Sequence, residues 1–155
     1  MEKEHVVTHL RNAKSAHISW LQKAKLLING VDVNEEAVPV DSTECNFGKW
    51  FYGEGQKLNA LSNNPPECMQ NIERLHFQLH DTYLTIFNIY FNKPKGGFFA
   101  KIFGTKKATL TPEELSLAKM NYEKMEGISH QLIDEINRLE RRLIAIPDDR
   151  LKKLI

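Results

Sequence analysis

The sequence predicts an all-α fold, most simply an up-down four-helix bundle with a short extra helix and a basic loop insertion. Three long stretches carry apolar residues at alternating steps of three and four, the spacing that places them on one face of a helix. No stretch shows the two-residue alternation of apolar and polar residues that would predict a strand. A chain of 155 residues is long enough for one hydrophobic core and short for two, so we expect a single domain over residues 1–155.

The first predicted helix covers residues 4–28 and ends at Asn29-Gly30, since glycine is common just after a helix end. Its stripe consists of Val6, Leu10, Ala13, His17, Trp20, Ala24 and Leu27. His17 therefore occupies a position at which the pattern calls for an apolar residue.

A second, shorter helix is predicted after a loop over residues 31–41, with Asp41 or Ser42 as its N-cap and its end in the glycines after Trp50. Cys45 then falls in the first turn. Backbone N–H groups and the positive end of the helix dipole favour a thiolate there. A short helical stretch around Leu58 and Leu61 follows.

The third predicted helix begins at Asn64, which caps a first turn containing proline, and runs to about Phe91. Its stripe consists of Met69, Ile72, His76, Leu79, Tyr83, Ile86 and Tyr90, with His80 beside it. A histidine again replaces an apolar residue, so the helices of residues 1–91 are expected to hold the metal-binding histidines.

Residues 92–111 break the helical pattern with glycines, a proline, lysines and phenylalanines. They are interpreted either as a loop whose aromatic residues cover the bundle end or as a patch that docks on a membrane surface or a partner. A last helix starts at the Thr111 cap and is ended by Pro147, within a C-terminal unit over residues 112–147 and before a tail over residues 148–155. Its near-heptad seam either closes the bundle or forms a coiled coil with a second copy.

Composition excludes several classes of protein. A formal net charge of +1 lacks the basic footprint of a dedicated nucleic-acid binder. No run of 18 apolar residues predicts a membrane span, and the first residues do not resemble a signal peptide, so we expect a cytoplasmic protein. In that compartment Cys45 and Cys68 are better interpreted as thiols or metal ligands than as a disulfide, which is the alternative.

Four residues form a candidate metal site. His76 and His80 lie four apart on one predicted helix, so both imidazoles can reach one ion. Burying them and His17 in apolar seams costs free energy unless each ring nitrogen finds a partner. One Zn²⁺ would supply that partner and neutralise the Cys45 thiolate, because zinc prefers tetrahedral sites of nitrogen and sulfur ligands. Iron or copper could bind the same ligands, but availability and geometry favour zinc. The alternative is a metal-free helical adaptor with ordinary core or surface histidines.

The chain also resembles a known family. The motif elements are Ala16-His17-Ile18-Ser19-Trp20-Leu21, then Cys45-Asn46-Phe47-Gly48-Lys49-Trp50 with Gly55 following, then His76 and His80. This order is similar to the signature of the chemoreceptor zinc-binding (CZB) domain. The resemblance implies zinc ligands at His17, Cys45, His76 and His80, and a symmetric homodimer. Family members usually adjoin a chemoreceptor or diguanylate cyclase region, which this chain lacks, and residues 92–111 look like an insertion.

Three motif residues are expected to shape the site. Gly48 lies one turn after Cys45, so the missing side chain lets another helix approach the metal, and Trp20 and Trp50 either shield the site from water or are plain core residues. Asp81 and Glu73 are candidate acceptors for the free ring nitrogens, by proximity in sequence alone. The other histidines, His5, His9 and His130, are interpreted as solvated.

Four protein ligands leave no open position for water or substrate, so the sequence predicts no enzyme. The favoured hypothesis is a sensor of zinc availability or of an oxidant such as hypochlorous acid, acting through Cys45. Its partner would be a chemoreceptor, another chemotaxis protein or a cyclic-di-GMP signalling protein. The alternative is an interaction module whose zinc only stabilises the fold.

Overall fold

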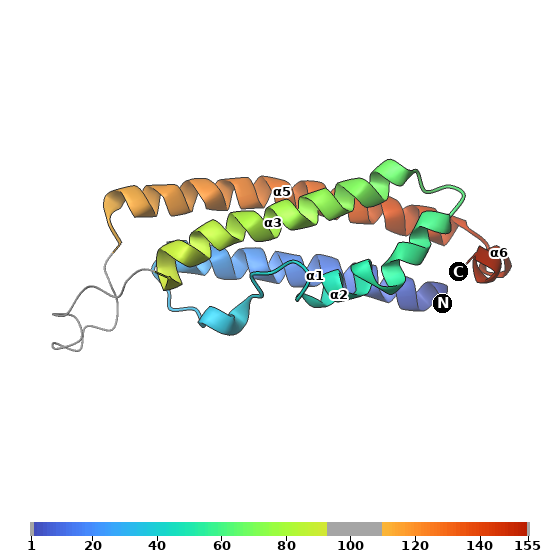
Figure 1. The fold of residues 1–155 in the computed structure, drawn as a ribbon, viewed down its shortest axis with the longest axis horizontal. Helices are drawn as coiled ribbons and strands as arrows, with labels where there is room; N and C mark the ends of the chain where they lie inside the picture. The colour runs from blue at the N-terminus through green and yellow to red at the C-terminus, as the bar shows by residue number, and fades with distance from the viewer. Residues whose placement is uncertain (1, 93–109, 155) are drawn as a thin grey trace.

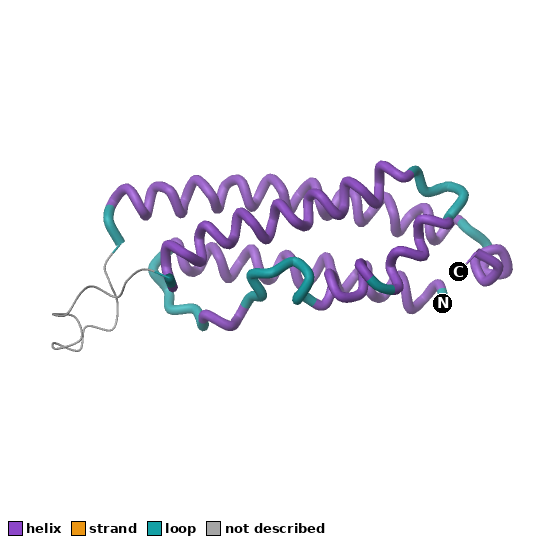
Figure 2. Tube along the Cα trace, in the orientation of Figure 1, coloured by secondary structure: helices purple, strands orange, loops and turns teal. Residues whose placement is uncertain are grey.

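Three long helices dominate the computed structural model, which describes residues 2–92 and 110–154. They are α1 (Lys3–Ile28), α3 (Pro66–Phe91) and α5 (Pro112–Ala145), and they lie side by side along their lengths (Figure 1). Regular structure in the described residues is helical throughout, without a strand (Figure 2). The all-α prediction and the three long helices are therefore confirmed.

The predicted fourth bundle helix is replaced by a chain of short elements. These are η1 (Glu35–Ala37), α2 (Asn46–Tyr52) and η2 (Glu54–Ala60), which run back along α1 (Figure 1). A seven-residue helix is too short to form a full bundle member, so the structure has three long helices with a mixed fourth layer. No helix in the described part of the chain has the length and hydropathy needed to cross a membrane.

The seam of α5 faces the interior of this chain. Its buried positions include Met125, Ser129, Leu132, Ile136, Leu139 and Leu143. The contact between α3 and α5 is the most extensive between helices, and α1 also packs on α5. Of the two alternatives for this seam, the structure shows the intramolecular one.

An ion-paired cluster joins α1 to α5 within this packing. The buried Glu140 carboxylate accepts hydrogen bonds from Arg11 Nε and from Lys14 Nζ, each at 2.7 Å. Burial alone would raise the pKa of Glu140, but these two cations and their hydrogen bonds outweigh it, so the pKa is lowered. Glu140 is therefore a charged link between the two helices.

Helix boundaries follow the sequence in part. Thr111 caps α5 as predicted, in a capping box with Glu114. Asn64 does not cap α3, because Pro65 is the N-cap and the Asn64 amide donates to the Leu58 carbonyl. Residues 148–154, expected as a tail, form α6 (Asp148–Leu154), where Asp148 pairs with Lys3 at 2.8 Å.

The prediction for α2 is wrong at its start. Asp41 bonds the backbone N–H and the hydroxyl of Thr43, both at 2.8 Å, and closes a turn of its own. The helix begins at Asn46, with Cys45 as N-cap, three residues later than a Ser42 cap would give. Both interpretations of the loop over residues 92–111 concern positions that lie almost wholly outside the described residues.

Candidate metal centre

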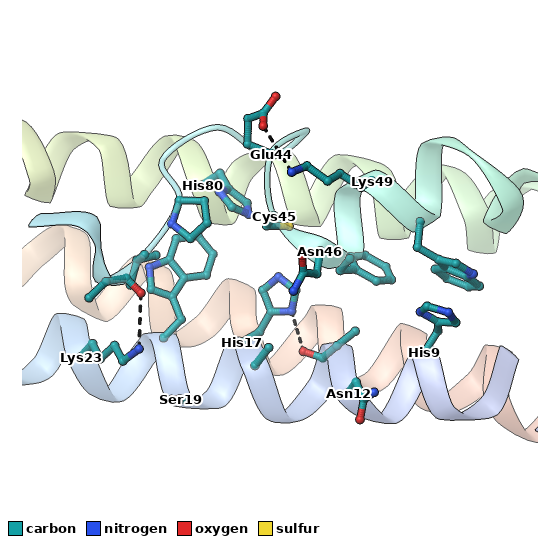
Figure 3. A pocket seen from close by; sticks show the side chains of 18 of the residues that line it. His9, Asn12, His17, Ser19, Lys23, Glu44, Cys45, Asn46, Lys49 and His80 are labelled. Carbon is teal, nitrogen blue, oxygen red and sulfur yellow. Dashed lines mark hydrogen bonds and ion pairs between the residues drawn. The ribbon is translucent and has the colours of Figure 1, made fainter. Parts of the chain in front are cut away.

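Four predicted residues meet between α1, the start of α2 and the middle of α3. His17 comes from α1, Cys45 precedes α2, and His76 and His80 lie one turn apart on α3. One ligand atom from each lies within 4.8 Å of the corresponding atom of every other member. The three imidazoles are buried and Cys45 is half-buried, and His17, Cys45 and His80 converge in the close view (Figure 3).

The spacing of the donor atoms suits a tetrahedral ion. His76 Nε2 lies 3.2 Å from Cys45 Sγ and 3.1 Å from His80 Nε2. Ligand bonds of about 2.0 Å to nitrogen and about 2.3 Å to sulfur would place tetrahedral donors about 3.3 to 3.6 Å apart. His76 is thus already at nearly the separations from Cys45 and His80 that one zinc ion requires.

Backbone carbonyls fix the orientation of two of these rings. His17 Nδ1 donates to the Ala13 carbonyl at 2.6 Å, and His80 Nδ1 donates to the Val40 carbonyl at 3.0 Å. A neutral imidazole carries one proton, so each of these rings keeps Nε2 free as a ligand. The predicted acceptors, Asp81 and Glu73, are exposed on the outer face of α3 and do not take part.

His76 differs from the other two histidines. Its Nδ1 is buried and has no hydrogen-bond partner among the described residues, while its Nε2 faces both Cys45 and His80. A buried ring with one orphaned nitrogen and a crowded second nitrogen lacks the compensation that a buried polar group needs. A cation between Nε2, Sγ and the second imidazole would satisfy Nε2, and the ring proton would then lie on Nδ1.

The electrostatic environment keeps the histidines neutral. Burial, reinforced by the neighbouring His17 and His80, lowers the pKa of His76 to about 2. Burial is also the main cause that lowers the pKa of His80 to about 4, and it lowers the pKa of His17. Neutral imidazole is the form that binds metal, so the site is set for a cation rather than for acid–base work at neutral pH.

Cys45 does not behave as its sequence position predicts. As the N-cap it accepts a hydrogen bond from Gly48 N–H at 3.2 Å, yet burial raises its pKa more than the Gly48 and Phe47 backbone groups lower it. The expectation that the helix dipole alone favours a thiolate is therefore wrong. A coordinated cation is needed to stabilise the thiolate, because thiols deprotonate when they bind a metal.

Aromatic rings surround the centre, and the sequence identified only some of them. Trp20 packs on His80 with ring centroids 4.3 Å apart. Phe47 contacts the rings of His17 and His76 at 5.7 and 5.0 Å, a role that its place between Cys45 and Gly48 in the motif could have suggested. Trp20 and Phe47 are themselves buried, so they belong to the core that surrounds the centre.

Trp50 lies further from the centre than Phe47 does and contacts it through Phe47. It packs on Phe47, with centroids 6.0 Å apart, and stacks on His9 at 5.1 Å with an interplanar angle of 8°. His9 is thus half-buried and not solvated as expected, whereas His5 and His130 are exposed. Burial, with a smaller effect of His5, lowers the pKa of His9.

Gly48 is required by its own loop and not by a neighbouring helix. A Cβ at this position would lie 1.8 Å from the Ser42 carbonyl oxygen. The glycine therefore allows residues 42–45 to fold tightly over the first turn of α2 and to present the Cys45 sulfur toward α3.

A groove of about 920 Å³ runs along the centre between α1 and residues 37–54. Three of the four candidate ligands line it, namely His17, Cys45 and His80 (Figure 3). Cys68 lies elsewhere, buried on α3 with its sulfur 3.9 Å from the Glu135 carbonyl oxygen, and both cysteines are free. The disulfide alternative is therefore wrong.

The fold and this centre describe a helical domain with a candidate metal site. Residues 17–86, just under half of the chain, match the family model described as the chemoreceptor zinc-binding domain. The match begins at His17 and extends past His80, so it spans every candidate ligand and confirms the resemblance seen in the motif. No curated protein and no solved structure gives a match.

Zinc is the cofactor of the matched family, and in this chain His17, Cys45, His76 and His80 form a group that could hold a metal ion. The family is a regulatory zinc-binding family and is not known for catalysis. The donor set is chemically consistent with that assignment, because three neutral imidazoles and one thiol supply the nitrogen and sulfur ligands of a four-coordinate zinc site.

Proposed function

We propose that this chain is a zinc-dependent sensor in which His17, Cys45, His76 and His80 hold one zinc ion and Cys45 responds to oxidants. The observation that carries the proposal is the donor set itself: three neutral imidazoles and a single sulfur, within 4.8 Å of one another, link α1, α2 and α3. Removing the only anionic donor of such a set would weaken its hold on the cation more than any other single change.

Zinc would supply charge stabilisation of the Cys45 thiolate, which is otherwise disfavoured by burial. The thiolate sulfur can attack the oxygen of hypochlorous acid, forming an S–O bond as the O–Cl bond breaks. The products are a sulfenic acid, which keeps the proton of the oxidant, and chloride. Sulfur loses two electrons and chlorine gains them, so the step needs no further reactant.

The output would be a change in the surface around Cys45. Of residues 39–46, only Ser42 is fully buried, and this stretch is held by Cys45 and by the His80 bond to the Val40 carbonyl. Losing the Cys45 sulfur from the centre would free this stretch and reshape the groove that it borders. A chemotaxis or cyclic-di-GMP signalling partner would detect that surface.

The deciding experiment measures zinc per chain by elemental mass spectrometry, on protein purified without a metal-affinity tag. About one zinc in the parent and clear loss in Cys45→Ala and His76→Ala would support the site. Zinc release by hypochlorous acid should then occur in the parent and in Cys68→Ala, which removes the other cysteine. Zinc release that proceeds while the Cys45 thiol stays unoxidised would contradict the redox role.

A second candidate function is an interaction module whose zinc only stabilises the fold. The complete burial of His76 favours it, because a metal bound at Nε2 would offset part of the free-energy cost of burying that ring. The two functions differ in the metal-free state: a sensor stays folded without zinc, whereas a scaffold of this kind unfolds.

The proposal includes a homodimer, but not through the seam of α5, which is buried within the chain. Exposed apolar residues outside that seam are the candidate surface, and on α3 they include Phe77 at 59% exposure and Leu84 at 37%. Light scattering of the parent beside Phe77→Ser tests this: loss of the dimer in the variant supports this face, and a monomeric parent contradicts the dimer.

A further inference from the structure

A second group of metal-binding side chains lies at the exposed end of α1, outside the buried centre. His5 and His9 are one turn apart, and their Nε2 atoms are 3.1 Å from each other. Glu54, at the start of η2, places Oε2 4.0 Å from His5 Nε2. We propose that His5, His9 and Glu54 form a second site, which takes a divalent transition-metal ion such as Ni²⁺, Cu²⁺ or Zn²⁺.

The two ring nitrogens already have the separation of a chelating pair. Two imidazoles bound to one ion at about 2.0 Å place their nitrogens about 3 Å apart, and histidines four apart on a helix reach a shared ion without a change in the backbone. The same 3.1 Å separation between two Nε2 atoms occurs in the buried centre, between His76 and His80. The pair on α1 thus repeats the geometry of the buried pair.

Packing fixes one member of the pair and leaves the other members free to adjust. The His9 ring is stacked on Trp50, almost parallel to it, so its direction is set by α2. The side chains of His5 and Glu54 are 57% and 59% exposed, so they can close on an ion that His9 positions. Nitrogen donors with one carboxylate suit nickel, copper and zinc rather than magnesium or calcium.

The location gives this site a structural consequence. His9 and Glu54 line the same groove as the three candidate ligands His17, Cys45 and His80. His9 and Lys23 lie at opposite ends of this groove (Figure 3). An ion held by His5, His9 and Glu54 would join the first turns of α1 to η2, next to the point where the buried centre joins α1 to α2. Both ions would then fasten the same short segment to α1.

Trp50 provides a direct measurement. Ni²⁺ titrated into the zinc-loaded protein should quench tryptophan fluorescence in a saturable manner, since the Trp50 ring stacks on His9. The quenching should be lost in Trp50→Phe. His5→Ala and His9→Ala should each weaken the apparent Ni²⁺ affinity at least about ten-fold, the effect of losing even a residue that only orients a metal ligand. Glu54→Gln should weaken it less.

Two controls separate this site from the buried centre. His130→Ala removes an exposed histidine on α5 and should leave the Ni²⁺ affinity unchanged. His76→Ala should reduce bound zinc, whereas His5→Ala should leave bound zinc unchanged and weaken Ni²⁺ binding, so that failure of one site cannot be mistaken for failure of the other. Equal Ni²⁺ affinity in the parent, His5→Ala and His9→Ala, with all three folded by circular dichroism, would overturn the proposal.

Discussion

At the residue scale, the buried histidines make the stability of the metal-free protein depend on pH. His76 and His80 have pKa values of about 2 and about 4 in the folded chain, mainly because of burial, and that of His17 is also lowered. An unfolded histidine has a pKa of about 6.5. Below pH 6.5 the unfolded chain therefore binds protons that the folded chain does not.

This difference in proton binding means that stability is full above pH 6.5 and is lost as the pH falls. Lowering the pH from 7 to 5.5 should cost the metal-free protein about 2 to 4 kcal/mol of unfolding free energy. Urea unfolding at the two pH values measures it. His130→Ala, which removes an exposed histidine, should show the same loss, and a metal-free parent equally stable at both values would contradict the assignment of neutral buried rings.

Gly48 gives a second residue-scale prediction. Gly48→Ala should lower the unfolding free energy by about 1 to 3 kcal/mol or more and reduce zinc content, since the new Cβ would meet the Ser42 carbonyl oxygen. Gly127→Ala is the matched control, because that glycine lies within α5 with nothing within 4 Å of a new Cβ. The control should gain about 0.5 to 1 kcal/mol. Thermal unfolding that ranks the two variants the other way would refute the close-approach role of Gly48.

The sequence predicts the four candidate ligands because each one either interrupts an apolar stripe or belongs to a motif with fixed spacing. His17 and His76 interrupt apolar stripes, and Cys45 belongs to a motif with fixed spacing. The hydrogen-bond acceptors that orient these ligands cannot be identified from the sequence in this way. Ala13 and Val40 act through backbone carbonyls, which every residue has, so side-chain chemistry pointed to Asp81 and Glu73 instead.

At the element scale, the long helices were predictable and the short segment between α1 and α3 was not. A stripe of seven positions fixes the face and length of α1 or α3, and Thr111 with Glu114 marks the start of α5. Residues 31–64 have no comparable period. The start of α2 is set by tertiary contacts that favour Cys45 as the cap over the better capping residues Asp41 and Ser42.

The link between α1 and α5 supplies the element-scale prediction. Glu140→Ala should lower the unfolding free energy by about 1 to 3 kcal/mol, since it removes two charged hydrogen bonds and leaves the half-buried Lys14 without its carboxylate. Glu123→Ala, at an exposed position of the same helix, should change it by less than about 0.5 kcal/mol. Chemical denaturation compares the two, and equal effects would show that the buried pair is not a distinct stabilising link.

At the scale of the whole molecule, the helical framework and the metal centre are joined at few points. α5 contributes no ligand, yet α1 and α3 both pack on it, and α3 does so along the most extensive interface. The two ligand-bearing long helices therefore share a packing partner that does not involve the ion. Cys45 is the only candidate ligand from the segment between α1 and α3.

This arrangement predicts a local response to metal removal. Chelation should leave most of the helical circular dichroism in place while hydrogen exchange rises in residues 39–52, because the Cys45 attachment of that stretch depends on the ion. The core of α3 and α5, around Ile72, Leu132 and Ile136, should remain protected, since these residues are fully buried against one another's helices. Cys45→Ala should show the same exchange pattern without chelation, and Cys68→Ala should not. Loss of protection across all three long helices would instead favour zinc as a structural element, because a sensor must keep its framework while one surface changes.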